Sequence, residues 1–178
     1  MPQKKITNRK AQMPIVLSRH DIDQSLPKTA KGLSQYLWLQ EQVANGGKFH
    51  EAIEFRRRYN HFYRVRRGAD WQKEYYALMA QAKERGLTFE GVLSALHQAT
   101  SRVEASFASK LYATINPSAP VIDSVVLEHV GLKLPSATTK DRVAAVCLIH
   151  NELAAQFRDY LQTDTGMYLV DKFKEMPD

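Results

Sequence analysis

The sequence predicts an all-α protein organised as a compact multi-helix domain. Three observations support this class: apolar residues recur at three- and four-residue spacings, capping residues and glycines mark the ends of these runs, and the connections are short. No convincing β-hairpin pattern accompanies them. Residues 1–14 are polar and basic and predict a flexible arm, whereas residues 15–178 predict a single helical domain.

The elements in the first half of the chain follow from apolar spacing and from the residues that end each run. Residues 48–65 leave helix and strand open, because their apolar residues also alternate. Asp70 and Thr88 are expected N-caps, and glycines 46 and 86 end the runs that precede them. Helices are therefore expected over 33–45, over 70–84 and over a shorter segment after 88.

The second half predicts four further helices around a proline-broken turn. Val103, Phe107 and Leu111 recur at four-residue steps, which is typical of an amphipathic helix. Residues 116–120 break this pattern, and Asp123 stands where the next helix begins. The expected helices run over 101–115, from 123 or 124 to 129, over 140–162 after a cap at Thr138 or Thr139, and over 166–175.

Composition excludes several classes of protein. The chain has 178 residues and a single cysteine, Cys147, so a disulfide scaffold is excluded and a reducing, cytoplasmic location is expected. No apolar stretch is long enough to predict a membrane span. Cys147 is expected to be a small buried hydrophobe in the long helix. The six histidines form no i,i+4 pair, so neither a metal site nor a cofactor is expected.

The net charge of +6 is concentrated in two segments that lack acidic residues. Residues 1–10 carry four basic side chains and residues 56–67 carry six arginines, which leaves a net charge of −4 on the rest. Guanidinium groups bind phosphates through paired donors, and aromatic residues between them can stack on unpaired bases. The segment therefore predicts contact with DNA; the alternative is a solvated helix face. The arginines are Arg56, Arg57, Arg58, Arg64, Arg66 and Arg67.

Asp123 is the leading candidate for chemistry. An aspartate at a helix start can accept backbone N–H groups as a cap, and it can also act as a base or stabilise a cationic transition state. Glu104 and Lys110, on the preceding predicted helix, are the carboxylate and the amine that could assist it.

Two segments carry a resemblance to known families. Residues 119–126, A-P-V-I-D-S-V-V, follow a helix and an Asn-Pro loop, and this arrangement resembles the helix-hairpin-helix DNA glycosylase superfamily, in which a proline, two apolar residues and an aspartate open a helix. The longer pattern R-V-E-x-S-F-x-S-K-L, N-P-x-x-P-V-x-D and G-L is similar to uncharacterised bacterial proteins placed as distant relatives of that superfamily.

The resemblance implies a glycosylase-like fold, DNA as partner and a catalytic role for Asp123 in releasing a damaged base. Bifunctional members carry a lysine nineteen residues before the aspartate, where this chain has Glu104, and Lys110 points in another direction on the helix, so lyase activity is not expected. The family's glycine hairpin corresponds to residues 97–102, which lack glycine; here Thr100, Ser101 and the backbone amides of the helix start are the expected phosphate ligands, with Arg102 nearby.

Three functions remain open from the sequence. The first is a monofunctional DNA N-glycosylase that uses Asp123. The second is a nucleic-acid-binding module without catalysis, and the third is a protein-interaction module in which Asp123 is only a cap and Glu104 pairs with Arg102 or Lys110.

Overall fold

A computed structural model describes residues 15–46 and 48–176, and within them it contains eight α-helices, one short 3-10 helix and no strand, which confirms the all-α prediction. The predicted arm, residues 1–14, lies outside the described residues. The ambiguous segment 48–65 is helical. The elements are α1 (Arg19–Ala44), the 3-10 helix η1 (Phe49–Glu51), α2 (Ile53–Tyr63), α3 (Ala69–Arg85), α4 (Phe89–Thr100), α5 (Ala105–Ile115), α6 (Ser124–His129), α7 (Arg142–Leu161) and α8 (Asp164–Lys174).

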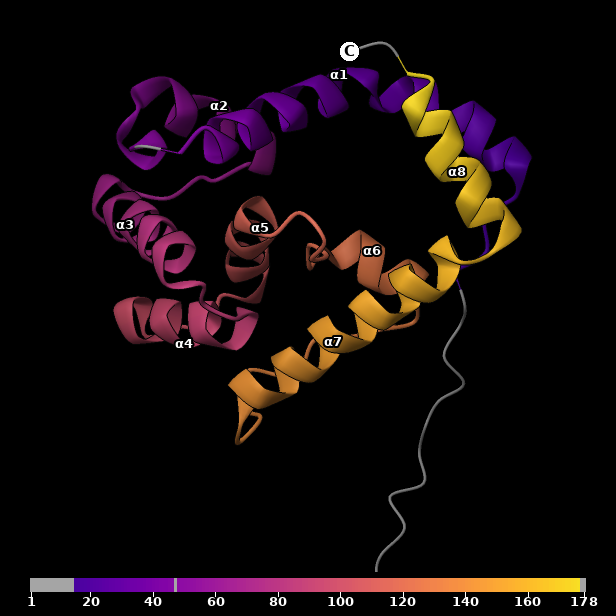
Figure 1. Cartoon of the computed structure of the whole chain (residues 1–178). Coiled ribbons are helices and arrows are strands. Elements are labelled where there is room, and N and C mark those ends of the chain that lie inside the picture. Colours follow the sequence, from indigo (N-terminus) through magenta and orange to yellow (C-terminus); the bar gives the residue numbers. More distant parts are fainter. Residues whose placement is uncertain (1–14, 47, 177–178) are drawn as a thin grey trace, which may run out of the picture.

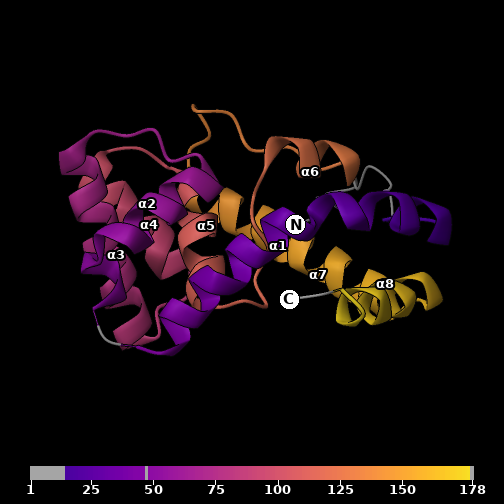
Figure 2. The same ribbon diagram turned by 90° about the horizontal axis from the view of Figure 1, so that it is seen from above.

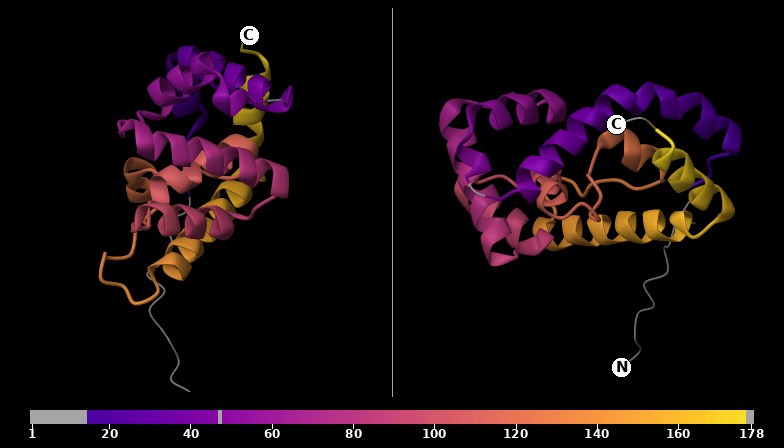
Figure 3. Two further views of the ribbon diagram at one scale, coloured as in Figure 1. Left: turned by 90° about the vertical axis from the view of Figure 1, so that its left-hand side faces the viewer. Right: turned by 45° about the horizontal axis from the view of Figure 1, so that its top comes forward.

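The helices gather at two ends of the molecule. Helices α2 to α5 and the last part of α1 lie at one end, and the first part of α1 lies beside α8 at the other (Figure 1). Helix α7 runs between the two ends, as the right-hand view of Figure 3 shows. Seen from above, α6 and α8 lie on opposite sides of the right-hand half of the molecule (Figure 2). None of the helices in the described residues is long and apolar enough to cross a membrane.

A cluster of tyrosines holds the α2–α5 end together. Tyr59, Tyr75 and Tyr76 are completely buried. The hydroxyl oxygens of Tyr59 and Tyr75 lie 2.8 Å apart, and Tyr75 also donates to the carbonyl oxygen of Phe107 at 2.8 Å. Tyr76 donates to Oδ1 of Asn60 at 2.8 Å. Because buried tyrosine hydroxyls need partners, these bonds fix α2 against α3 and α5.

Helix α1 begins at Arg19, well before the expected start at residue 33. Its N-terminus is a capping box: the Ser18 hydroxyl accepts from the Asp21 N–H, and the Asp21 carboxylate accepts from the Ser18 N–H. Pro27 lies inside the helix. The sequence does not predict helix over residues 19–32, because this segment is mostly polar and contains Pro27. Its only buried apolar residues are Ile22 and Leu26, which are too few to show a clear helical spacing.

Most expected helix ends are confirmed, and two N-caps are wrong. Thr88 caps α4, with its hydroxyl 3.2 Å from the N–H of Gly91. Asp70 lies in the first turn of α3, whose N-cap is Gly68. Helix α7 begins after Asp141 and not at Thr138 or Thr139; the Asp141 carboxylate accepts from the N–H of residue 144 at 3.0 Å. Each error is a shift of two or three residues.

The predicted helix over 101–115 is shorter than expected. Helix α4 continues to Thr100, and Ser101 ends it in the left-handed conformation with φ of 57°. Three further residues form a turn before α5 begins at Ala105. The four-residue apolar spacing is real but extends across this turn, so α4 and α5 form a helix pair with a sharp connection.

Cys147 packs against the apolar core from the middle of α7 and is half-buried. Burial raises the pKa of its thiol, and the nearby carboxylates add to that effect. The expected contact with the core is confirmed, whereas the expected full burial is wrong, because Cys147 stays partly exposed.

Candidate functional site

The arginine segment does not form one free surface, because Glu54 engages two of its members. Arg57 donates to the Glu54 carboxylate through Nε at 2.9 Å and Nη2 at 2.8 Å, and Arg58 donates through Nε at 2.6 Å. These hydrogen bonds lower the pKa of Glu54 to about 2. Glu54 lies just before the acid-free stretch in sequence, and the helix brings it onto the same face.

Arg56 has a structural role at the same helix. Its Nε donates to the carbonyl oxygen of His50 at 2.6 Å, and its guanidinium lies 5.1 Å from the ring centre of Tyr76. Arg56 is therefore held by contacts within the protein, whereas Arg57 and Arg58 share one carboxylate and remain exposed to solvent.

The other three arginines lie beyond the end of α2. Arg64 and Arg66 line a pocket of about 380 Å³ beside α1. Arg67 points away from that pocket toward Glu104, and its Nη2 lies 2.9 Å and 2.8 Å from the two carboxylate oxygens. The Glu104 side chain is 9% exposed and that of Arg67 is 32% exposed, so this ion pair is largely shielded from water. The expected pairing of Glu104 with Arg102 or Lys110 is wrong.

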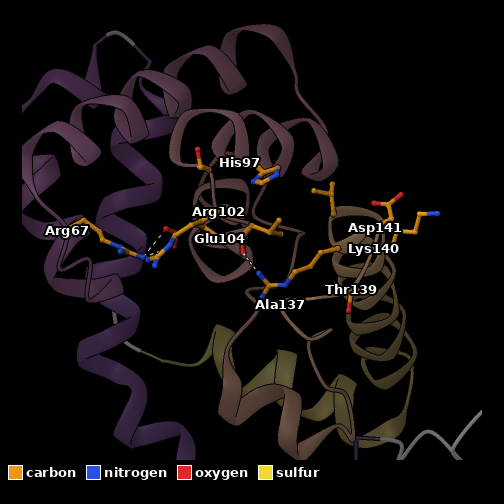
Figure 4. Close-up of a pocket in the computed structure, with 12 residues that line it drawn as sticks. Arg67, His97, Arg102, Glu104, Ala137, Thr139, Lys140 and Asp141 are labelled. Carbon is orange, nitrogen blue, oxygen red and sulfur yellow. Dashed lines mark hydrogen bonds and ion pairs between the residues drawn. The ribbon is translucent and has the colours of Figure 1, made fainter.

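The Arg67–Glu104 pair forms one side of a pocket of about 640 Å³. Figure 4 shows this pair on one side, His97 above it, and the beginning of α7 with Lys140 and Asp141 on the other side. Val103 and the loop before α7 complete the wall. The lining residues are Arg67, His97, Ser101, Arg102, Val103, Glu104, Ala137, Thr139, Lys140, Asp141, Arg142 and Val143. We call this the hairpin pocket, because the α4–α5 turn lies at its edge.

The hairpin pocket is positively charged. Four cationic side chains and two carboxylates line it, which gives a net formal charge of +2 with His97 neutral. Both carboxylates already have partners: Glu104 accepts from Arg67, and Asp141 caps α7. Arg102 and Lys140 are exposed. The pocket therefore has cations available for an anionic ligand.

Two polar atoms of the hairpin pocket are buried without a hydrogen-bond partner among the described residues. They are Nε of Arg142 and Nδ1 of His97. Arg142 donates to the carbonyl oxygen of Val103 at 3.4 Å through Nη1. A buried polar atom without a partner costs free energy, and six other side chains among the described residues also contain one, so this feature alone does not distinguish the hairpin pocket.

Ser101 gives the α4–α5 turn a conformation that normally favours glycine. The sequence predicts that a phosphate-binding turn is difficult to form here without glycine, yet Ser101 adopts φ of 57°. Ser101 and Arg102 are both exposed and line the hairpin pocket. The Thr100 hydroxyl instead donates to the carbonyl oxygen of Leu96 at 2.8 Å.

Asp123 is the N-cap of α6, as predicted. Its Oδ1 accepts from the N–H of Val125 at 2.9 Å and from that of Val126 at 3.4 Å. Asp123 is exposed, and it lines a separate pocket of about 460 Å³. The other residues that line this pocket are Ser106, Ile122, Ser124, Leu127, Glu128, Leu132, Lys133 and Leu134.

The three candidate catalytic residues do not converge on one cavity. Glu104 lies in the hairpin pocket, whereas Asp123 lines the other pocket. Lys110 lines neither; its Nζ donates to the carbonyl oxygen of Tyr63 at 3.1 Å. Burial lowers the pKa of Lys110, and the nearby Asp123 carboxylate partly opposes that shift. The charge of Asp123 thus acts on Lys110, whereas Glu104 forms its ion pair with Arg67.

Sequence reasoning missed the contribution of α7 to the hairpin pocket. Lys140, Asp141 and Arg142, at the beginning of α7, line it and did not belong to the predicted site, whereas His97 of α4 lies within residues 97–102, which the resemblance matches to the hairpin. The run Lys140-Asp141-Arg142 is a visible cluster of charges, but nothing in the sequence places it beside residue 103. Among the described residues there is no group of three or more His, Cys, Asp or Glu side chains that could hold a metal ion.

Comparisons with protein-family models, with curated proteins and with solved structures found no match.

Proposed function

We propose that this protein binds nucleic acid, and that the hairpin pocket holds phosphates of its backbone. The observation that carries the proposal is the charge arrangement of the pocket: its two carboxylates are occupied, while Arg102 and Lys140 are exposed at its edge. Phosphate contacts supply most of the affinity in non-specific nucleic-acid binding, and arginine and lysine are the residues that make them.

The α4–α5 turn supports the same ligand. Ser101 in the left-handed conformation turns the chain sharply between two helices, and Arg102 follows directly. A phosphate at this turn would gain the Ser101 hydroxyl and the Arg102 guanidinium together. The order of helix pair, proline-containing loop and aspartate-capped helix also agrees with the resemblance to helix-hairpin-helix DNA glycosylases, which favours DNA as the partner.

The proposal is tested by measuring binding of a fluorescent DNA duplex across a range of salt concentrations. Arg102→Gln and Lys140→Gln should each weaken binding, and each should reduce the slope of log K against log salt by about 0.9 if one phosphate contact is lost. Arg158→Gln is the matched control, since Arg158 is exposed and lies about 24 Å along α7 from Arg142. A loss no larger than that of the control would overturn the assignment.

A second candidate function is removal of a damaged base at Asp123, as a monofunctional glycosylase. The exposed Asp123 carboxylate on a largely apolar pocket of about 460 Å³ favours it, because such a pocket could receive an extruded base. Asp123→Asn should then abolish base release from damaged duplexes while DNA binding persists. Unchanged release by that variant would remove Asp123 from the chemistry. The single cysteine supports a cytoplasmic setting for either function.

A further inference from the structure

A second positively charged pocket lies between α1 and the end of α2. Its volume is about 380 Å³, which falls within the range of small-molecule sites. Its lining contains two arginines and a histidine. Within the described part of the chain, no acidic residue lines this pocket. The lining residues are Gln35, Asn60, His61, Phe62, Arg64 and Arg66. We call this the α1–α2 pocket.

Arg64 occupies a backbone position that glycine would fill with less strain. It ends α2 with φ of 54°, its N–H bonds back to the carbonyl groups of Asn60 and His61, and the N–H of Val65 reaches the Asn60 carbonyl at 2.9 Å. Left-handed residues at helix ends of this kind are usually glycine. An arginine in this position adds backbone strain. Its side chain is exposed and lines the α1–α2 pocket.

Phe62 is the half-buried phenylalanine of the arginine segment, and its ring centre lies 6.2 Å from that of Tyr36 and 4.7 Å from that of Tyr63. Tyr59 and Tyr63 are buried: the Tyr59 hydroxyl lies beside that of Tyr75, and the Tyr63 hydroxyl accepts from Thr114. Phe62 is only half-buried and lines the α1–α2 pocket. Aromatic faces of this kind stack on nucleic-acid bases with little dependence on sequence.

Asn60 lines the pocket but is not available to a ligand, because both ends of its amide are already bonded within the protein. Its Nδ2 donates to Oε1 of Gln72 at 2.8 Å, and its Oδ1 accepts from Tyr76 at 2.8 Å. The groups that a ligand could meet are therefore the cations Arg64 and Arg66, the exposed His61 and the half-buried ring of Phe62.

From this combination we propose that the α1–α2 pocket binds one unpaired nucleotide, with its phosphate on Arg64 and Arg66 and its base against Phe62. The inference rests on the proposed nucleic-acid binding and deepens it. Bases in a duplex are stacked on each other and cannot reach a single protein ring, so the pocket selects single-stranded nucleic acid or a free nucleotide. The linker 64–68 carries Arg64 and Arg66, which line the α1–α2 pocket, and Arg67, which lines the hairpin pocket.

The sharpest test is Arg64→Gly, because stability and binding should change in opposite directions. Glycine relieves the left-handed backbone, so the thermal midpoint should rise. The same variant should bind a mixed-sequence single-stranded DNA oligonucleotide about tenfold more weakly, since a charge-assisted phosphate contact is lost. Phe62→Leu, which keeps an apolar side chain of similar size, should weaken single-strand binding and leave duplex binding unchanged. Arg158→Gln again controls for the loss of one positive charge.

Three results would be decisive. If Arg64→Gly and Phe62→Leu weaken single-strand binding no more than Arg158→Gln does, the α1–α2 pocket is not the site, even if Arg102→Gln still impairs duplex binding and so upholds the proposed function. If Arg102→Gln and Lys140→Gln leave duplex binding intact while Arg64→Gly impairs single-strand binding, the α1–α2 pocket is upheld as a binding site and the proposed function of the hairpin pocket is overturned. Titration with adenosine monophosphate distinguishes the source: competition with the oligonucleotide indicates a free nucleotide, and its absence with oligonucleotide binding retained indicates an unpaired nucleotide within a strand.

Discussion

Glu104→Gln should weaken the fold and strengthen nucleic-acid binding at the same time. In the native protein both Glu104 oxygens accept from Arg67, at 2.9 Å and 2.8 Å, with the carboxylate nearly out of contact with water. A glutamine keeps one acceptor and loses the charge. Charge-assisted hydrogen bonds contribute roughly 1.5 to 3 kcal/mol, so losing part of this pair should cost about 1.5 kcal/mol. For a chain of this length that corresponds to a thermal midpoint lower by about 3 to 6 °C.

The binding change follows from the same pair. Without the carboxylate, the formal charge of the hairpin pocket rises from +2 to +3, and Arg67 becomes available to a phosphate. One further phosphate contact should steepen the log–log salt dependence by about 0.9 and tighten duplex binding several-fold at low salt. Fluorescence anisotropy at several salt concentrations measures both quantities, and thermal unfolding measures the stability.

Glu54→Gln is the matched control, because it removes the same charge and frees Arg57 and Arg58 on α2. It should produce a smaller gain in affinity than Glu104→Gln. Unchanged or weaker DNA binding by a destabilised Glu104→Gln protein would refute the placement of phosphate beside Arg67. A larger gain from Glu54→Gln would move the interface to α2.

Three further predictions concern stability and are measured by urea unfolding. Ser101→Gly should raise the free energy of unfolding by about 0.5 to 1 kcal/mol, because glycine relieves the left-handed backbone; a decrease would contradict the strain. Ser109→Ala should lower it by about 1 to 3 kcal/mol, since the buried N–H of Ile122 loses the hydroxyl that it reaches at 2.8 Å. Burial against Phe89 lowers the pKa of His150, so protons bind the unfolded chain more readily and stability should decline as the pH falls below about 6.5. His150→Gln should flatten that decline, and equal slopes for the two proteins would exclude His150 as its source.

Features set by neighbouring residues could be predicted from the sequence. Thr88 and Asp123 cap helices where expected, and Gly86 and Gly131 take the positive φ that ends α3 and follows α6. These motifs depend on hydrogen bonds within a few residues, so local composition determines them. The pairing of Arg57 and Arg58 with Glu54 was also within reach, since Glu54 is one helical turn away, but it required segment 48–65 to be recognised as helical.

The candidate site could not be predicted, because distant segments build it. Arg67 meets Glu104 across 37 positions, and Arg142 meets Val103 across 39. Two arginines that look alike in the sequence can therefore belong to different sites. Arg66 and Arg67 are adjacent, yet they line different pockets. Which arginines remain free is decided by where the acidic partners fall after packing, and spacing along the chain carries no information on that.

Pro27 divides α1 into two segments that should differ in how readily they unfold locally. Proline has no N–H to bond within the helix, so the segment before it is joined to the rest of α1 by a weakened ladder. That outer segment packs with α8, where Gly166 is the buried residue among those described, whereas the inner part carries Leu39 and Val43 into the core. Backbone amides of α8 and of residues 19–26 should therefore exchange with deuterated solvent together, and earlier than those of α2 to α5. The first part of α1 and α8 should therefore open together, while the hairpin pocket and the α1–α2 pocket stay formed.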